Sequence, residues 1–164
     1  MNLSQTEIMI FLPILIAFGL WTGWNDMRHM KITNNTVLLL AGIFAVIGFF
    51  ILPLDAYLWR WAYAAIALGI TFVMNAFRMI GGGDAKFVAA GALFVASGDW
   101  VSAAVILVCT MMATPILMLI ARISPIRRMT PDWKCWTAGL HLPMGIALGS
   151  ALILYYVVAL KMTV

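Results

Sequence analysis

Apolar runs long enough to cross a lipid bilayer fill most of this chain. A helical span needs roughly 20 apolar residues, because the hydrocarbon core of a bilayer is about 30 Å thick. Of the 164 residues, 65% are hydrophobic and only 10% are charged, too few charges to cover the surface of a soluble domain. The pattern predicts six spans, at residues 8–24, 37–53, 57–77, 87–96, 101–120 and 140–160.

The expected fold is therefore an all-α membrane protein, a polytopic bundle of about six transmembrane helices. The predicted spans leave no room for a soluble domain, so we expect residues 1–164 to form a single transmembrane domain. The fourth predicted span, 87–96, is unusually short. A lipid bilayer is the expected surrounding of nearly every predicted helix.

The basic residues predict the orientation of the bundle. With the N-terminus outside, the inside segments are roughly 25–36, 78–86 and 121–139, and they hold eight of the ten Lys and Arg residues. Only Arg60 and Lys161 then lie outside, as the positive-inside rule requires. The net charge of +4 is explained by this orientation and indicates no nucleic-acid partner.

Four of the six acidic residues have simple interpretations. Glu7 and Asp55 lie at the outer ends of predicted spans, and Asp132 lies in a basic loop. Asp99 lies in the short outer turn SGDW, where aspartate is common. We expect these four carboxylates to be solvated end, loop or turn charges.

Asp26 and Asp84 differ from the other acids. Asp26 closes the first span and Asp84 opens the fourth, so both are expected on the inner face, although 58 positions separate them. Packing of the first helix beside the fourth could bring the two carboxylates together. From Asp84 to Asp99 a helix covers about 22 Å, less than the hydrocarbon core, so Asp84 would lie below the inner surface.

The glycines before Asp84 point to a wet pocket. Non-helical backbone at membrane depth is tolerated only beside protein or a water-filled cavity, and an ionisable residue there indicates a functional site. The alternative for Asp84 is a helix N-cap, with the glycines as an ordinary turn. The alternative for Asp26 is a solvated carboxylate, which a helix C-terminus disfavours unless the helix runs on into the cytosol.

Two close carboxylates suit the hydrolysis of a peptide bond. One holds a proton while the other is charged, and the pair titrates as a unit. The charged group can take a proton from water while the protonated group polarises the scissile carbonyl. This chemistry needs no metal and no cofactor, and the two cysteines form no Cys-x-x-Cys pair that would indicate a thiolate zinc site.

Three motifs, in order along the chain, resemble those of the type IV prepilin peptidases, which are polytopic aspartic proteases. GGGDAK at 81–86 resembles their Gly-x-Gly-Asp signature. WNDMRHMKITNN resembles the element around their first aspartate, with Thr33 where a proline is usual. LPMGIAL at 142–148 is similar to a late Pro-Tyr-Gly segment, with Met144 where a tyrosine is usual.

The resemblance implies a catalytic pair, Asp26 and Asp84. It implies that the substrates are prepilins or pseudopilins, whose basic leader is cut at the cytoplasmic face of the bacterial inner membrane. The residues that it suggests for substrate binding or for shaping the site are Gly81, Gly82, Gly83, Lys86, Arg28, Asn34, Pro143 and Gly145.

The chain resembles the short branch associated with Flp-type, tight-adherence pili. It carries no N-terminal region with paired Cys-x-x-Cys motifs, so we expect a peptidase without methyltransferase activity. An archaeal preflagellin peptidase is an alternative with the same mechanism. A small transporter or a non-enzymatic assembly factor is an alternative from another class, because a buried Asp beside a glycine-broken helix also marks ion sites.

Overall fold

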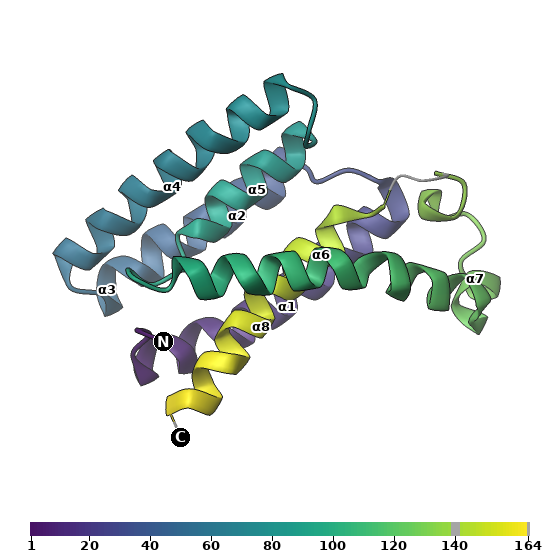
Figure 1. Ribbon diagram of the computed structural model, residues 1–164. Helices are drawn as coiled ribbons and strands as arrows, with labels where there is room; N and C mark the ends of the chain where they lie inside the picture. Colours follow the sequence, from purple (N-terminus) through teal and green to yellow (C-terminus); the bar gives the residue numbers. More distant parts are fainter. Residues whose placement is uncertain (139–141, 164) are drawn as a thin grey trace.

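The computed structural model of the chain describes residues 1–138 and 142–163, and the described residues form helices and no strand (Figure 1). A π-helical turn, Phe44–Gly48, joins α2 to α3, and a 3-10 turn, Lys134–Trp136, follows α7. The helices in chain order are α1 (Gln5–His29), α2 (Asn34–Ile43), α3 (Phe49–Ile51), α4 (Leu54–Ala76), α5 (Gly82–Ala92), α6 (Trp100–Ile123), α7 (Pro125–Met129) and α8 (Met144–Thr163).

Five helical segments of the described chain are long and apolar enough to cross a membrane: Gln5–His29, Asn34–Ile51, Leu54–Ala76, Trp100–Ile123 and Met144–Thr163. The sixth, α5, has only 11 residues and is about 16 Å long. The structure thus confirms an all-α membrane bundle in which the helix of the fourth predicted span, α5, is short.

The bounds of the fourth predicted span need correction. The fourth was predicted at 87–96, but α5 begins earlier, at Gly82, and ends earlier, at Ala92. Gly82 and Gly83 belong to its first turn, where a helix leaves its N–H groups unpaired in any case. The predicted start of the last span, residue 140, lies outside the described residues, and α8 is described from Met144 onward.

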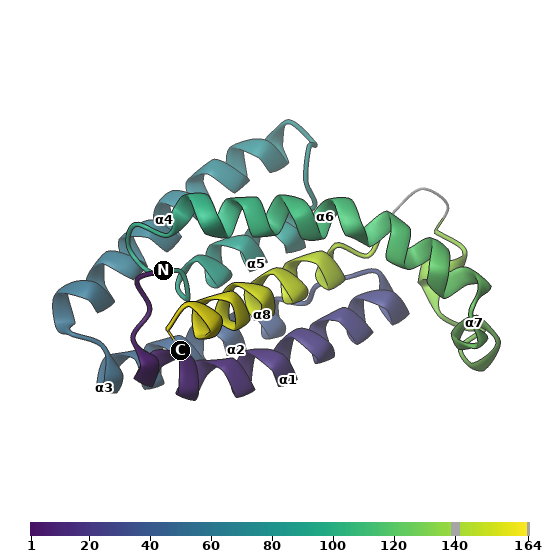
Figure 2. The ribbon, with the colours of Figure 1, turned by 60° about the horizontal axis from the view of Figure 1, so that its bottom comes forward.

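Helices α1 and α8 make the most extensive contact in the bundle, and they overlap in Figure 1 and run beside each other in Figure 2. A Cβ atom placed on Gly149 of α8 would lie 2.9 Å from the carbonyl oxygen of Gly19 on α1. Small residues permit this backbone approach, which is how membrane helices gain packing energy. Helix α8 also packs on α6, while α5 packs on α4 and α2.

An aromatic cluster fills the core between α1, the π-helical turn and the segment after α5. The ring of Phe94 contacts Phe11 edge-on at 5.1 Å and Phe44 at 5.4 Å between centroids. Phe44 also stacks on Tyr57 of α4 at 5.6 Å. All three phenylalanines are fully buried, so this cluster joins the first four helical segments into one core.

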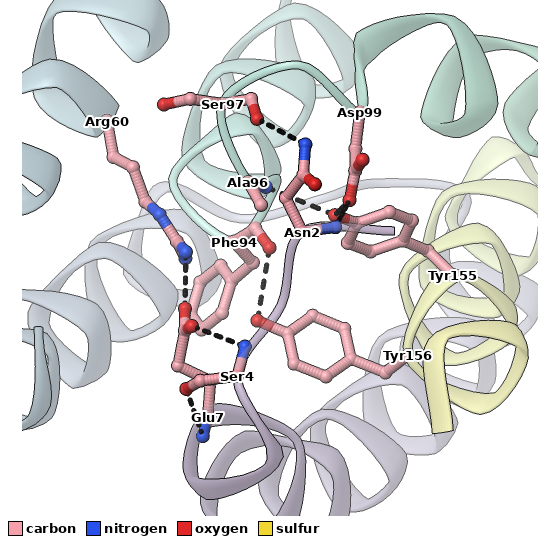
Figure 3. A network of polar contacts seen from close by, with 10 residues as sticks. All are labelled: Asn2, Ser4, Glu7, Arg60, Phe94, Ala96, Ser97, Asp99, Tyr155 and Tyr156. Carbon is pink, nitrogen blue, oxygen red and sulfur yellow. Dashed lines mark hydrogen bonds and ion pairs between the residues drawn. The ribbon is translucent and has the colours of Figure 1, made fainter. Parts of the chain in front are cut away.

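The chain turns back inside the protein after α5, which is why this helix can be short. Leu93 and Phe94 are buried, so their backbone has no access to water. The Tyr156 hydroxyl donates to the Phe94 carbonyl at 3.0 Å, and the Ala96 N–H donates to the Tyr155 hydroxyl at 3.1 Å (Figure 3). Two tyrosines of α8 therefore satisfy the non-helical backbone, as membrane depth requires.

Two acids that the sequence analysis placed in solvent are buried in this region. The Asp99 carboxylate accepts hydrogen bonds from the Asn2 N–H at 2.8 Å and the Tyr155 hydroxyl at 2.9 Å. Glu7 forms an ion pair with Arg60 of α4, and both side chains are buried (Figure 3). The expectation of solvated charges was wrong for these two, because each carboxylate meets a donor that is distant in sequence. Asp55 and Asp132 are exposed, as expected.

The Glu7–Arg60 ion pair predicts a large loss of stability when one charge is removed. Glu7→Gln leaves the buried Arg60 guanidinium uncompensated, and breaking a buried pair in this way costs about 3–5 kcal/mol. The free energy of unfolding in detergent should fall by this amount. Asp55→Asn, the same change of charge on an exposed side chain of α4, should alter it by less than about 0.5 kcal/mol. Equal stability of the two variants would refute the role given to the ion pair.

Candidate active site

A cavity of about 780 Å³ lies where α1 ends and α5 and α8 begin, away from the two chain termini (Figure 1). Asp26 and Asp84 both line it. Residues of the linker between α1 and α2 and of the loop between α4 and α5 also line the cavity. The start of α8 contributes Met144 and Leu148. The two carboxylates that the sequence singled out therefore share one cavity.

Asp26 is held by the N-terminus of α8. The Gly145 N–H donates to Asp26 Oδ2 at 2.6 Å, and Asp26 is only 5% exposed. Gly145 is the second residue of α8, so its N–H has no partner within its own helix and lies at the positive end of the helix dipole. Helix α1 runs on for three residues beyond Asp26, to His29. The alternative of a solvated Asp26 is therefore wrong.

Gly145 has no room for a side chain. A Cβ atom at this position would lie 2.7 Å from Cβ of Asp26 and 3.0 Å from its Oδ2. The close approach that brings the N–H to the carboxylate therefore requires glycine at this position.

Asp84 is the third residue of α5 rather than its N-cap. Gly81 is the N-cap, so the interpretation of Asp84 as a capping residue is wrong, and so is the expectation that all three glycines are non-helical. The carboxylate folds back toward Gly81, where a Cβ atom would lie 2.7 Å from Asp84 Oδ2. The first turn of a helix favours a negative charge. Burial and the charge of Asp26 nevertheless raise the pKa of the Asp84 carboxyl to about 6.

Helices α1 and α5 touch each other, and α8 packs on both of them. Phe18 of α1 stacks on Phe87 of α5 at 6.3 Å between ring centroids. Helix α8 packs extensively on α1 and less extensively on α5, which packs mainly on α4. The expected packing of the first span beside the fourth is thus a narrow contact. Asp26 and Asp84 are close enough for their charges to interact.

Two polar residues of α4 position the segment that carries Asp84, and the sequence analysis missed both. Asn75 Nδ2 donates to the Ile80 carbonyl at 2.7 Å, just before the glycines. One helical turn earlier, Thr71 Oγ1 lies 3.1 Å from the Ala85 carbonyl, just after Asp84. The signal was available, because the two residues lie four positions apart and so share one face of the third span.

The predicted site residues divide into two groups. Gly81 and Gly83 line the cavity, and a Cβ on Gly83 would lie 3.0 Å from the carbonyl oxygen of Ile32. Gly82 lies beside the Asn75 amide, and Pro143 is buried directly before α8.

The structure does not bring the remaining predicted residues to the cavity. Lys86 donates to Asn34 Oδ1 at 2.9 Å on the exposed surface, and Arg28 is exposed without lining the cavity. The cations that do line it are Lys31 and Arg78, which the sequence analysis did not select. Motif position alone suggested Arg28, Asn34 and Lys86. The cations that face the cavity instead lie just after the C-terminal ends of α1 and α4.

Cys135 carries a free thiol near this end of the bundle. It is fully buried in the 3-10 turn that packs on α1, and burial raises the pKa of its thiol. A neutral, buried thiol is a poor nucleophile. In the part of the chain that the structure describes, no three His, Cys, Asp or Glu side chains gather as a metal ion would need.

The fold and the cavity define a polytopic membrane protein with two carboxylates at one end of its helices. The model of the type IV leader peptidase family matches residues 13–123, which is 111 of the 164 residues and includes Asp26 and Asp84. The chain therefore belongs to the type IV leader peptidase family, and it is a membrane peptidase with a protein substrate. No curated protein and no solved structure matches this chain.

The contact between Gly145 and Asp26 predicts a selective loss of activity. Gly145→Ala would push the Asp26 carboxylate away, and a displacement of 1 Å at a catalytic group can cost about a hundredfold in rate. We expect leader cleavage to fall by about this factor. Gly69→Ala is the matched control, because a Cβ there meets no atom within 4 Å. A Gly145→Ala enzyme with the rate of the control would contradict the positioning role.

Proposed function

We propose that this protein is an aspartic endopeptidase that removes the basic leader from Flp-type prepilins or pseudopilins. Asp26 and Asp84 are its catalytic residues. The observation that carries the proposal is that these two carboxylates, from α1 and α5, line one cavity and interact electrostatically. The family match supports peptidase chemistry, and the residues of the cavity supply a means for it.

Hydrolysis follows from a pair that holds one proton. The ionised carboxylate takes a proton from a water molecule, whose oxygen bonds to the scissile carbonyl carbon. The protonated carboxyl donates to the carbonyl oxygen as the tetrahedral intermediate forms. When the C–N bond breaks, the carboxyl that took the proton from water gives it to the leaving amine, while the other carboxylate takes a proton back from a hydroxyl group of the intermediate. The pair therefore again holds a single proton.

The hydrogen bond from Gly145 would restrain Asp26 during this cycle. A carboxylate that accepts an N–H at a helix N-terminus keeps a fixed orientation, while its second oxygen stays free for water. On the other side, the contacts of Asn75 and Thr71 hold the segment around Asp84. Helix α8 thus holds the Asp26 carboxylate, and α4 holds the backbone on either side of Asp84, which limits the reorganisation that the reaction would need.

The distribution of basic residues supports cleavage at the cytoplasmic face of the inner membrane. Lys31 and Arg78 line the cavity. Arg122, Arg127 and Arg128 lie in the last turns of α6 and α7. Loops rich in Lys and Arg stay in the cytoplasm.

The Flp-type substrate rests on the resemblance to the short branch of the family. On the same ground we propose a single peptidase domain over residues 1–164, without methyltransferase activity. Mass spectrometry of the cleaved product would test the absence of methyltransferase activity. A methylated N-terminus adds one CH₂ group, about 14 Da, and its detection would contradict the proposal.

Replacing either aspartate should abolish cleavage. Asp26→Asn and Asp84→Asn are nearly isosteric and remove the acid–base function, so co-expressed Flp-type prepilin should keep its leader, as judged by gel shift and mass spectrometry. Asp55→Asn and Asp132→Asn, both on exposed side chains, are the controls and should cleave normally. Cleavage by either site variant at the rate of the controls would refute a two-aspartate mechanism.

The mechanism also predicts that activity survives metal removal. Neither step of the proposed acid–base cycle uses a metal ion. Purified enzyme dialysed against EDTA should therefore cut the leader at its original rate. A loss of activity that added Zn²⁺ or Mg²⁺ restores would contradict the proposal.

A further inference from the structure

An apolar groove runs along α5 between α4, α6 and α8. Its volume is about 250 Å³, and its walls carry no charged side chain. Small residues from three helices form much of the wall, among them Ala67 of α4, Gly91 of α5 and Ala104 of α6. The hydroxyl of Thr71, a polar group in the wall, is turned toward backbone carbonyls of α4 and α5.

The groove adjoins the cavity that holds the two aspartates. Val88 of α5 and Leu148 of α8 line both spaces. The groove extends from this junction toward Trp100 and Tyr155, near the opposite end of α5. An apolar segment that lies in the groove would therefore reach the neighbourhood of Asp26 and Asp84 at one end.

We propose that this groove binds an apolar helix of the substrate, adjoining the bond that is cut. The proposal rests on the peptidase function proposed above and names the surface that selects the substrate. A chain in the groove meets apolar side chains and no free backbone partner, so it must satisfy its own hydrogen bonds and be helical. The small residues of the wall let such a helix approach closely.

The size of the groove limits how the helix binds. A volume of about 250 Å³ accepts a few side chains and not a whole helix. The helix would therefore lie along α5 with one face in the groove and the other in lipid. Beyond the junction at Val88 and Leu148 the walls include polar and charged side chains among apolar ones, so the segment that enters the cavity can unwind and expose its amide to the two carboxylates.

The test compares two tryptophan variants on two substrates. Ala104→Trp fills the groove, whereas Ala65→Trp adds the same bulk to an exposed position of α4 outside it. One substrate is the membrane-anchored prepilin. The other is a water-soluble peptide with the leader and the cleavage site but without the apolar helix. We expect Ala104→Trp to slow cleavage of the anchored substrate at least tenfold and to leave the soluble peptide unaffected, while Ala65→Trp changes neither.

Two results would overturn the proposal while leaving the peptidase function intact. One is cleavage of the anchored prepilin by Ala104→Trp at the wild-type rate. The other is equal slowing of both substrates, which would mean that the groove acts on the aspartates and not on a substrate helix. If the wild type cuts neither substrate, the proposed function itself fails, and this inference with it.

A second measurement does not depend on how well the tryptophan variant folds. A photo-crosslinking residue at position 104 or 65 is placed in the Asp84→Asn protein, which should bind prepilin without cutting it. We expect the crosslink at 104 to join the apolar helix of the prepilin, and position 65 to yield none. Crosslinks from 104 to lipid alone, or to a second copy of this chain, would overturn the proposal.

Discussion

The hydrogen bond from the Gly145 N–H to Asp26 is the contact on which the candidate site depends. A carboxylate near the C-terminus of α1 is unfavourable on its own, and an unpaired N–H at the start of α8 is equally unfavourable in an apolar setting. Each group satisfies the other. This contact closes one end of the long α1–α8 interface, and the glycine pair Gly19 and Gly149 lets the backbones meet further along it. Asp26 is thereby presented to the cavity in one orientation.

The opposite end of the bundle explains how the site can lie below the surface. Tyr155 and Tyr156 of α8 satisfy the non-helical segment that follows α5 inside the protein, so α5 does not need to span the bilayer (Figure 3). A short α5 leaves space at its start, where the cavity forms, and along its side, where the apolar groove forms. The cavity and the groove therefore both depend on the buried turn that follows α5.

Much of this arrangement could be predicted from residues alone, and the misses have physical causes. The apolar runs predicted the helices, and the face shared by Asp26 and Asp84 followed from counting spans. Glu7 and Asp99 were misjudged because their partners, Arg60 and Tyr155, lie far along the chain. Although Asn75 and Thr71 share one face of their span, the sequence does not mark them as positioning residues, since the carbonyls that they contact, of Ile80 before α5 and Ala85 within it, approach them only in the folded chain.

By itself the sequence determined the membrane class, the short fourth helix and the two candidate carboxylates, because hydrophobic length and local motifs depend only on neighbouring residues. Only the tertiary structure decided what stands beside each carboxylate. Helix α8 holds Asp26 beside the cavity and α4 holds the segment around Asp84, and Lys31 and Arg78 rather than Arg28 and Lys86 face it. Such choices depend on helix crossing and on the paths of the linkers, which are set by packing between residues that are distant in sequence.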